Sequence, residues 1–485
     1  MPSARREFNP GRLDGFSRHC EHPAAMTRTL IKNGTILTVD PRFGDLDRGD
    51  LLIEDDRIVE VGRDLAAAGA DEIDASRMIV MPGLVNTHIH TWETGLRGIG
   101  ADWVSHRDYH GNMHGNLATR FGAADNYVAN LVGALGQLDG GTTTILDWCH
   151  NITSPDMADA ALDGLAESGI RAVFGHGTAK PPAKAGDKPY YELPFPREPL
   201  ARLRKGRLAS DDSLITLAMA ILGPDYTSYE IAAEDMRLAR EFGVIASAHT
   251  WGRPSRRTPD GMLRLARAGL LGPDHNIVHG NAIPDEELKI CADAGCTVSA
   301  TPLAEMMNSP QGALLGRYEK YGGLTSIGTD VDVYFSSSML AVTRHAFMHQ
   351  RELDNRELQD IGHWPPQRHR TNTRRALEWA TIGGAKVLRL DHRIGSLTPG
   401  KQADVVMIRT DDLNTFPTVP GGDPVHAVVM YAENANVDTV LVAGKAVKRG
   451  GKLVYPADRL AAKKEVLAAS RERIMRAGNY TYRVA

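Results

Sequence analysis

The chain has 485 residues, of which 42% are hydrophobic and 24% charged, and 56 Lys and Arg residues against 60 Asp and Glu residues leave a formal net charge of -4. This composition is typical of a globular protein with a large core and roughly two to four domains. The balanced charge argues against a nucleic-acid or anionic-membrane partner and favours a small-molecule substrate. Four scattered cysteines without a C-x-x-C pair favour a reducing, cytoplasmic compartment.

The first 26 residues contain basic side chains but no apolar stretch of the length that a secretory signal needs. We expect residues 1–26 to form a disordered tail. A mitochondrial presequence is the alternative, and the acidic residues in this segment argue against it. No later segment approaches the about 18 consecutive apolar residues of a membrane span, so no membrane partner is expected.

Residues 27–81 contain short strand-like runs, TLIKNGTILTVD, DLLIEDDRIVEVG and DEIDASRMIVMPG, separated by Asn-Gly, Asp-Asp and Pro-Gly turn signals. This pattern predicts a small antiparallel sheet. The same pattern returns within residues 392–455, in KQADVVMIRT, HAVVMYAE and VDTVLVAGKAVKRGGKLV. We therefore expect one composite β-sandwich domain from residues 27–81 and 392–455, followed by a C-terminal helix and tail at 456–485.

Residues 82–391 alternate short apolar runs with helical stretches, which is the pattern of βα units around a parallel sheet. The runs, in order, are LVNTHIH, TTTILDWCH, IRAVFGHGTA, LITLAMAILGP, VIASAHT, NIVHGNAI, TVSATP and LTSIGTD. Eight such runs predict an α/β protein whose main domain is a (β/α)8 TIM barrel, with the β-sandwich as a small second domain. In such barrels the chemistry lies at the carboxyl ends of the strands. The polar residues at those ends are His88, His90, His150, His176, His249, His279, Glu305 and Asp330.

His88 and His90 occupy alternate positions of the first run, so their imidazoles point to one face and can both bind one divalent ion. Two core or surface histidines are the alternative for this pair alone. His249 and Asp330, at the ends of the fifth and eighth runs, would add two ligands from the same rim. We expect one divalent ion at these four residues, with zinc as the first choice and iron, cobalt or manganese as alternatives. Such an ion lowers the pKa of a bound water towards about 7.

Three residues are candidates for catalysis. His279, which ends the sixth run, can hold the attacking water or stabilise developing charge, although a hydrogen-bonded core histidine is the alternative. Asp330 can move a proton from the water to the leaving group. Glu305, in TPLAEMMNS after the seventh run, is either a proton donor or a solvated loop residue.

Three segments resemble the amidohydrolase superfamily, in particular its branch of cytosine deaminase, guanine deaminase and s-triazine hydrolases. PGLVNTHIHTWETGLRG is similar to the strand-one motif of this branch, SIGTDVD to its strand-eight motif, and GSLTPGKQADVV to its return into the β-sandwich. The resemblance implies metal ligands and a catalytic histidine at the positions already singled out, which are His88, His90, His249, Asp330 and His279.

The resemblance also bears on the number of metal ions. Two-metal branches carry a carboxylated lysine at the end of strand four, and AMAILGP has none, so one ion is expected. Lys180, in GHGTAKPP, is off that position and is either solvated or faces the substrate.

One departure from the deaminase pattern changes the expected reaction. Deaminases of this branch have a glutamate three residues after the strand-five histidine, where this chain has Gly252. HIHTWETGLRG, DWCHN, RAVFGHG and LAMAILGPDY resemble a narrower group with molinate (thiocarbamate) and phenylurea hydrolases, whose substrates have no ring nitrogen to protonate. We expect hydrolysis of an amide, urea or carbamate-type C–N bond other than a peptide bond. The alternatives are a deaminase or dechlorinase of a nitrogen heterocycle, with Glu305 supplying the proton, and a non-catalytic oligomeric scaffold.

Four further residues near the expected ligands are predicted to contact the substrate: Trp92, Glu93, Trp251 and Lys180. Packing is the alternative for the tryptophans, and a solvated loop position for Glu93. His106, His110 and His114 form a four-residue ladder that is either a second metal-binding face or the solvated side of a helix. The Pro- and Lys-rich residues 181–199 predict a loop over the barrel mouth. By analogy with relatives, we expect a homo-oligomer, a dimer or larger.

Overall fold

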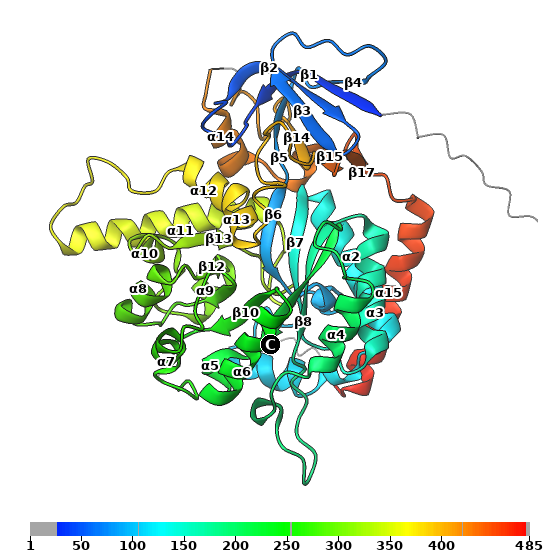
Figure 1. Ribbon diagram of the computed structural model, residues 1–485. Coiled ribbons are helices and arrows are strands. Elements are labelled where there is room, and N and C mark those ends of the chain that lie inside the picture. Colours follow the sequence, from blue (N-terminus) through cyan, green and yellow to red (C-terminus); the bar gives the residue numbers. More distant parts are fainter. Residues whose placement is uncertain (1–26, 105, 253–254, 420, 482–485) are drawn as a thin grey trace, which may run out of the picture.

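The computed structural model describes residues 27–104, 106–252, 255–419 and 421–481, so the predicted tail at 1–26 lies outside the described residues (Figure 1). Eight parallel strands form one sheet in chain order. The strands are β6 (Leu84–Ile89), β7 (Thr142–Cys149), β8 (Arg171–Gly177), β9 (Ile215–Ile221), β10 (Ile245–Thr250), β11 (His275–His279), β12 (Thr297–Ala300) and β13 (Leu324–Ile327).

The first and last strands of this sheet meet just beyond their carboxyl ends. A parallel bridge joins Ile89 to Asp330, and the amide of Asp330 donates to the carbonyl of His88 over 2.9 Å. Seven of the eight predicted apolar runs contain one whole strand, and the sixth run contains all of β11 except its first residue, His275. The (β/α)8 barrel is therefore confirmed.

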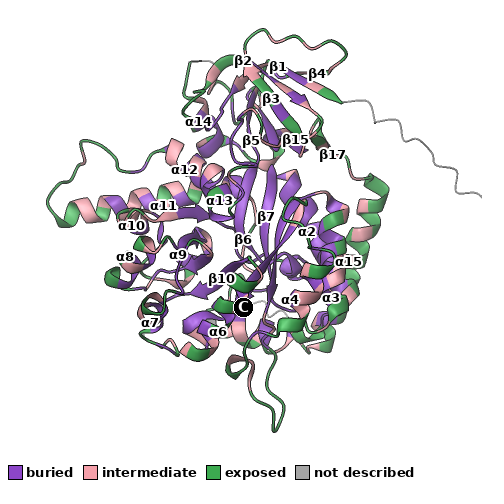
Figure 2. Cartoon of the chain, viewed as in Figure 1, coloured by how far each residue is buried: buried purple, intermediate pink, exposed green. Residues whose placement is uncertain are grey.

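Helices surround the barrel strands (Figure 1). They are α2 (Ala123–Asp139), α3 (Pro155–Ser168), α4 (Arg197–Lys205), α6 (Tyr229–Glu241), α7 (Gly261–Arg267), α8 (Asp285–Asp293), α10 (Leu315–Glu319), α11 (Met339–Asp360), α12 (Thr373–Trp379) and α13 (Ile382–Val387). Helix α3 illustrates the local signals: it follows Ser154, begins with Pro155 and ends before Gly169, whose φ of 79° is typical of a left-handed C-terminal residue. Figure 2 shows that burial is concentrated in the barrel strands, with exposed residues on the outer helix faces.

Shorter elements lie at the ends of the strands and in the connecting loops. They are η1 (Thr91–Leu96), α1 (His106–Tyr109), η2 (His110–His114), η3 (Leu117–Arg120), η4 (Tyr190–Glu192), α5 (Gly223–Tyr226), α9 (Pro302–Asn308), α14 (Pro424–His426), η5 (Ala427–Tyr431) and η6 (Asn434–Asn436).

A second sheet combines both ends of the chain. Its nine strands are β1 (Arg28–Ile36), β2 (Leu46–Glu54), β3 (Arg57–Gly62), β4 (Asp71–Asp74), β5 (Met78–Pro82), β14 (Val405–Arg409), β15 (Val437–Val442), β16 (Lys445–Arg449) and β17 (Lys452–Leu453). Antiparallel pairing of β5 with β14 joins the two segments. The prediction of a purely antiparallel sheet was wrong, because β1 pairs in parallel with both β4 and β5. The chain returns from β3 to β4 and β5 by a crossover rather than a hairpin, and parallel pairs need such a connection.

The last helix, α15 (Ala457–Ala477), packs against the barrel on α2 and η1. The hydroxyl of Ser470 donates to Asp125, near the start of α2, over 2.5 Å. No helix within the described ranges has both the length and the apolar character to cross a membrane.

Candidate metal centre

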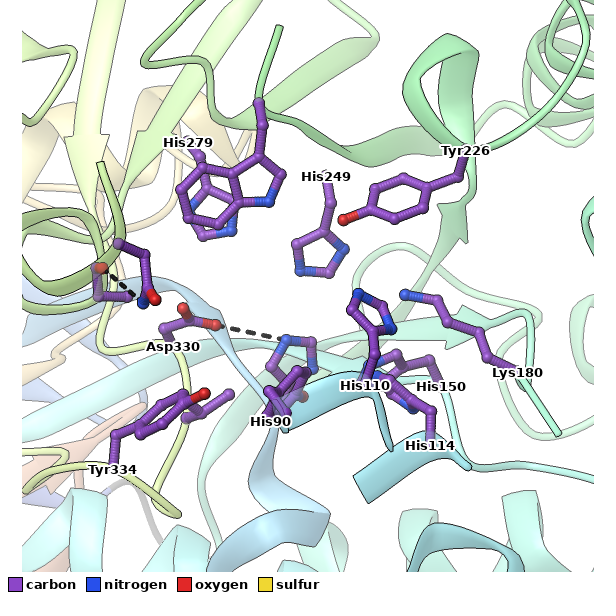
Figure 3. A pocket seen from close by; sticks show the side chains of 15 residues that line it. His90, His110, His114, His150, Lys180, Tyr226, His249, His279, Asp330 and Tyr334 are labelled. Atoms are coloured by element: carbon purple, nitrogen blue, oxygen red, sulfur yellow. Dashed lines mark hydrogen bonds and ion pairs between the residues drawn. The ribbon is translucent and has the colours of Figure 1, made fainter. Parts of the chain in front are cut away.

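The carboxyl ends of the barrel strands surround a narrow cavity (Figure 3). Its 15 lining residues include six histidines, four Tyr or Trp residues, one lysine and a single carboxylate, that of Asp330. The cavity therefore combines many imidazoles with flat aromatic walls and has almost no negative charge.

Four of the predicted residues form one compact group of possible metal ligands. The ligand atoms of His88, His90, His249 and Asp330 all lie within 4.8 Å of one another, and all four residues are buried. Asp330 Oδ1 lies 3.3 Å from His88 Nε2 and 3.4 Å from His90 Nε2. His249 Nε2 lies 3.2 Å from His88 Nε2. The residues from the first, fifth and eighth strands thus meet at one point.

The protonation of this group fits a cation. His90 Nδ1 lies 2.7 Å from the carbonyl oxygen of Trp148, a contact that requires a proton on Nδ1 and leaves the Nε2 lone pair for a metal. Burial lowers the pKa of His88 to about 4 and that of His249 well below its usual value, so these imidazoles are neutral. Three neutral imidazoles and a carboxylate form a donor set that suits zinc.

Two central residues have backbone angles that are rare for residues other than glycine. His279 has a φ of 73° and Asp330 a φ of 62°. Such left-handed conformations raise the energy of the chain and are concentrated at functional sites. The left-handed conformations of His279 and Asp330 turn the chain sharply at the end of β11 and after β13. Both side chains line the cavity.

His279 is held by neighbours on its ring face and at Nδ1. Its ring stacks on Trp251, with centroids 3.9 Å apart and planes inclined by 23°. Its Nδ1 lies 2.9 Å from the Thr301 hydroxyl and 3.4 Å from Glu305 Oε1. Because these two contacts engage Nδ1, the other ring nitrogen, Nε2, is the one that can act in the cavity.

Glu305 does not line the cavity, contrary to its predicted role of donating a proton to the substrate. It is fully buried behind His279, and its Oε1 accepts the amide N–H of Thr301 over 2.8 Å. Burial raises the pKa of Glu305 to about 8. Because α9 begins at Pro302, directly after the strand, the helical turn directs this carboxyl back towards the barrel. Glu305 can reach the chemistry only through His279.

The four predicted substrate contacts divide into two pairs. Trp251 and Lys180 line the cavity. Trp92 and Glu93 lie in η1 beneath it, fully buried, and each supports a lining residue instead of lining the cavity. The indole N–H of Trp92 donates to His150 Nδ1 over 3.2 Å, and Glu93 accepts the hydroxyl of Tyr109 over 2.6 Å.

Sequence reasoning did not single out Tyr109 and Tyr226, and it gave His150, His110 and His114 no place among the predicted site residues. His150, His110, His114, Tyr109 and Tyr226 all face the cavity. The four-residue spacing of the histidine ladder was the available signal for two of them, but the alternative of a solvated helix side is wrong for the buried His114. Within the described ranges, they do not extend the group of close metal ligands.

The backbone at Gly252 excludes the glutamate of the deaminase pattern. Gly252 has a φ of 74°, and a Cβ at this position would lie 2.3 Å from the amide nitrogen of Ile283. Its N–H donates to Asp225 Oδ2 over 2.8 Å. Only glycine fits this turn, so the absence of glutamate is built into the local fold.

Comparisons with known proteins agree with this arrangement. The amidohydrolase family profile matches residues 79–447. A 5'-deoxyadenosine deaminase from Methanobrevibacter smithii is 30% identical over 443 residues, which cover 87% of this chain and 93% of that protein. A 5-methylthioadenosine/S-adenosylhomocysteine deaminase from Symbiobacterium thermophilum is 28% identical over 452 residues, which cover 87% of this chain and 94% of that protein.

Solved structures show the same fold. An adenosine deaminase from Xanthomonas campestris with bound zinc has a TM-score of 0.77 at 22% identity and covers 93% of this chain and 99% of its own. An atrazine chlorohydrolase from Arthrobacter aurescens complexed with zinc has a TM-score of 0.77 at 22% identity. The match covers 91% of this chain and 100% of the chlorohydrolase chain. These relatives support the superfamily and do not support the narrower resemblance to molinate and phenylurea hydrolases.

Proposed function

The chain belongs to the amidohydrolase family and is a hydrolase of C–N bonds other than peptide bonds, and we propose that it removes an amino substituent from a nitrogen heterocycle with water. This reaction was the alternative predicted from the sequence. The compact group of three imidazoles and one carboxylate, facing an aromatic-walled cavity, carries the proposal. The deaminases that align over most of the chain support the heterocycle as substrate.

The cavity walls suit a planar ring. Trp251, Tyr226, Tyr109 and Tyr334 line it, and flat aromatic side chains favour the faces of flat ligands. The cavity is narrow, with only about 30 Å³ open to the centres of water-sized molecules, so a heterocyclic substrate would extend beyond it. A larger space lined by Tyr190, Tyr191 and Arg257 adjoins it through the shared residues His110, Tyr226 and Trp251.

In the proposed mechanism, His88, His90, His249 and Asp330 would hold one divalent ion, which supplies Lewis-acid chemistry and activates water. Asp330 Oδ1 faces His88 and His90, so Oδ2 is the oxygen placed to accept a proton from water and return it to the departing amine. His279 Nε2 stabilises the charge that develops at the attacked carbon or its ring nitrogen. Thr301 and Glu305 keep His279 in this orientation.

Hydrolysis of an amide, urea or carbamate remains a second candidate, because Gly252 stands where deaminases of this branch have the glutamate that protonates the ring. A ring nitrogen needs a proton donor, and Asp330 is the single carboxylate among the lining residues. A carbonyl substrate avoids this need, since only its departing amine requires protonation.

The predicted homo-oligomer, a dimer or larger, and the predicted cytoplasmic location also stay predictions.

A substrate panel with zinc-loaded protein distinguishes these functions. We expect ammonia release from 5'-deoxyadenosine, adenosine, cytosine or guanine, and slower or no cleavage of phenylureas and carbamates. Cleavage of the second group alone would overturn the proposal. Chelation is expected to abolish the activity, and zinc to restore it. A preparation that has no metal and recovers none on reconstitution would instead support the non-catalytic scaffold.

A further inference from the structure

Lys180 brings a buried positive charge into the cavity. It follows β8, and the residue is only 7% exposed. Figure 3 shows its amino group directed into the space beside His110. The ammonium lies 5.0 Å from the ring centroid of Tyr226 and 5.8 Å from that of Trp148. These aromatic faces partly stabilise a cation but do not neutralise it.

The ammonium has no anionic partner in the part of the chain that the structure describes. No hydrogen bond or salt bridge connects Lys180 to any of these residues. The carboxylate of Asp330, the single one in the lining, is engaged by His88 and His90. Glu93 lies behind Tyr109, and burial raises its pKa well above the usual value, so it does not supply a full negative charge.

A buried, unpaired ammonium is energetically unfavourable, and a partner that arrives with the substrate removes this penalty. Burial lowers the pKa of Lys180 to about 8, which leaves most of the population charged at neutral pH. A divalent ion bound to three neutral imidazoles and one carboxylate would add further positive charge. With such an ion bound, the positive charges around the cavity would outnumber its single carboxylate, and this favours negative ligands.

We propose that Lys180 forms a subsite for a carboxylate on the substrate, so that the enzyme prefers acidic heterocycles over the neutral ones of the substrate panel. The identity of the reacting group rests on the proposed function, whereas the anion subsite does not. One lysine without a lining arginine suits a single carboxylate rather than a phosphate, which arginine pairs hold better. Figure 3 places Lys180 and Tyr226 on one side of the metal centre and His279 on the other, so the acidic group would lie at the end opposite His279.

Benzoate and benzamide provide a direct test, because they share size and shape and differ in charge. Their binding to zinc-loaded wild type, Lys180→Met and Lys188→Met is measured by calorimetry. Lys188 is exposed in the same loop and serves as the matched control. We expect Lys180→Met to weaken benzoate binding by about 10- to 100-fold, as for a lost hydrogen bond to a charged group, and benzamide binding by less than about 3-fold. Lys188→Met should change neither.

Two outcomes would overturn the subsite. Benzoate affinity that survives in Lys180→Met would show that the zinc alone binds the carboxylate, and equal losses for both probes would show a steric role for Lys180. Thermal unfolding tests whether Lys180→Met is still folded. This variant should be at least as stable as the wild type, because the substitution removes an unpaired buried charge.

Turnover provides a second measurement. An aminoheterocycle with a carboxylate should show a KM raised by about 10-fold or more in Lys180→Met, whereas its carboxamide analogue should not. If neither is deaminated, the proposed function fails while the benzoate result still decides the subsite.

Discussion

His279 is the residue whose role depends most on its surroundings. It is not one of the four close ligands, yet it stacks on Trp251 and contacts Thr301 and Glu305. We expect His279→Gln to lower kcat by about 10²- to 10⁴-fold, the range for loss of an acid–base group. Zinc content, measured by mass spectrometry, should stay at one ion per chain. Loss of zinc in this variant would show that His279 is a ligand.

Glu305→Gln tests the carboxylate behind His279 separately. Glutamine can still accept the amide N–H of Thr301, so the fold should be kept while the titratable carboxyl group beside His279, whose pKa burial raises to about 8, is removed. A loss of about 10- to 100-fold in kcat with little change in KM is expected for such a supporting residue. A raised KM with kcat unchanged would instead place Glu305 against the substrate.

Gly252 permits a test of why the deaminase glutamate is missing. Gly98 has the same φ of 74° but open space where a Cβ would lie, whereas a Cβ at 252 meets the backbone of Ile283. Gly98→Ala should therefore cost about 1–2 kcal/mol for the left-handed backbone. Gly252→Ala should cost about 1–3 kcal/mol more, because the chain must move apart. Urea unfolding measures both, and equal losses would contradict the steric explanation.

The sequence predicted the residues whose positions follow from strand ends alone. His88, His90, His249, His279 and Asp330 come together because all strands of a parallel barrel end at one rim. The orientations of Trp92, Glu93 and Glu305 could not be predicted in this way. Each lies in a helical turn that starts directly after a strand, and the turn rotates the side chain away from the cavity.

At the scale of elements, the eight apolar runs predicted the barrel, because each run was bounded by turn signals and followed by a helical pattern. The second sheet was less predictable. Its hairpin signals indicated antiparallel neighbours, but the position of β1 beside β4 and β5 depends on a crossover that no local pattern reveals.

The loop that carries Lys180 is anchored by helix α6. Asp235 in this helix accepts the amide N–H of Phe195 over 2.8 Å, and burial raises the pKa of Asp235 to about 7. The folded state therefore retains a proton that the unfolded chain releases near pH 4. Stability should fall as the pH rises from about 4 to 7 and then level off, with an upper limit of about 4 kcal/mol from this group.

Asp235→Asn removes this titration and keeps an acceptor for Phe195. Denaturant unfolding between pH 4.5 and 8 should give a flatter stability profile for the variant than for the wild type. Arg237→Gln, on the exposed side of the same helix, is the control and should follow the wild type, because Arg237 is not among the groups that shift the pKa of Asp235. Parallel profiles for wild type and Asp235→Asn would contradict the raised pKa.

At the scale of the whole molecule, one buried ion pair connects the barrel to the second sheet. Arg171, at the start of β8, donates to Asp404 over 3.1 Å and 2.9 Å, and both side chains are 2% exposed. Asp404 directly precedes β14 and also accepts the amide N–H of Ala443 over 2.8 Å. The pair thus links the barrel to the C-terminal strands β14 and β15.

Arg171→Met should destabilise the protein by about 3–5 kcal/mol, because it leaves the Asp404 carboxylate buried without its cation. Arg207→Met is the matched control: Arg207 pairs with Asp163 on the barrel surface, where its side chain is 39% exposed, and its loss should cost at most about 1 kcal/mol. The double variant Arg171→Met/Asp404→Asn should recover part of the lost stability, since no uncompensated charge remains. A cost for Arg171→Met no larger than that for Arg207→Met, measured by urea unfolding, would show that the Arg171–Asp404 pair does not hold the barrel and the second sheet together.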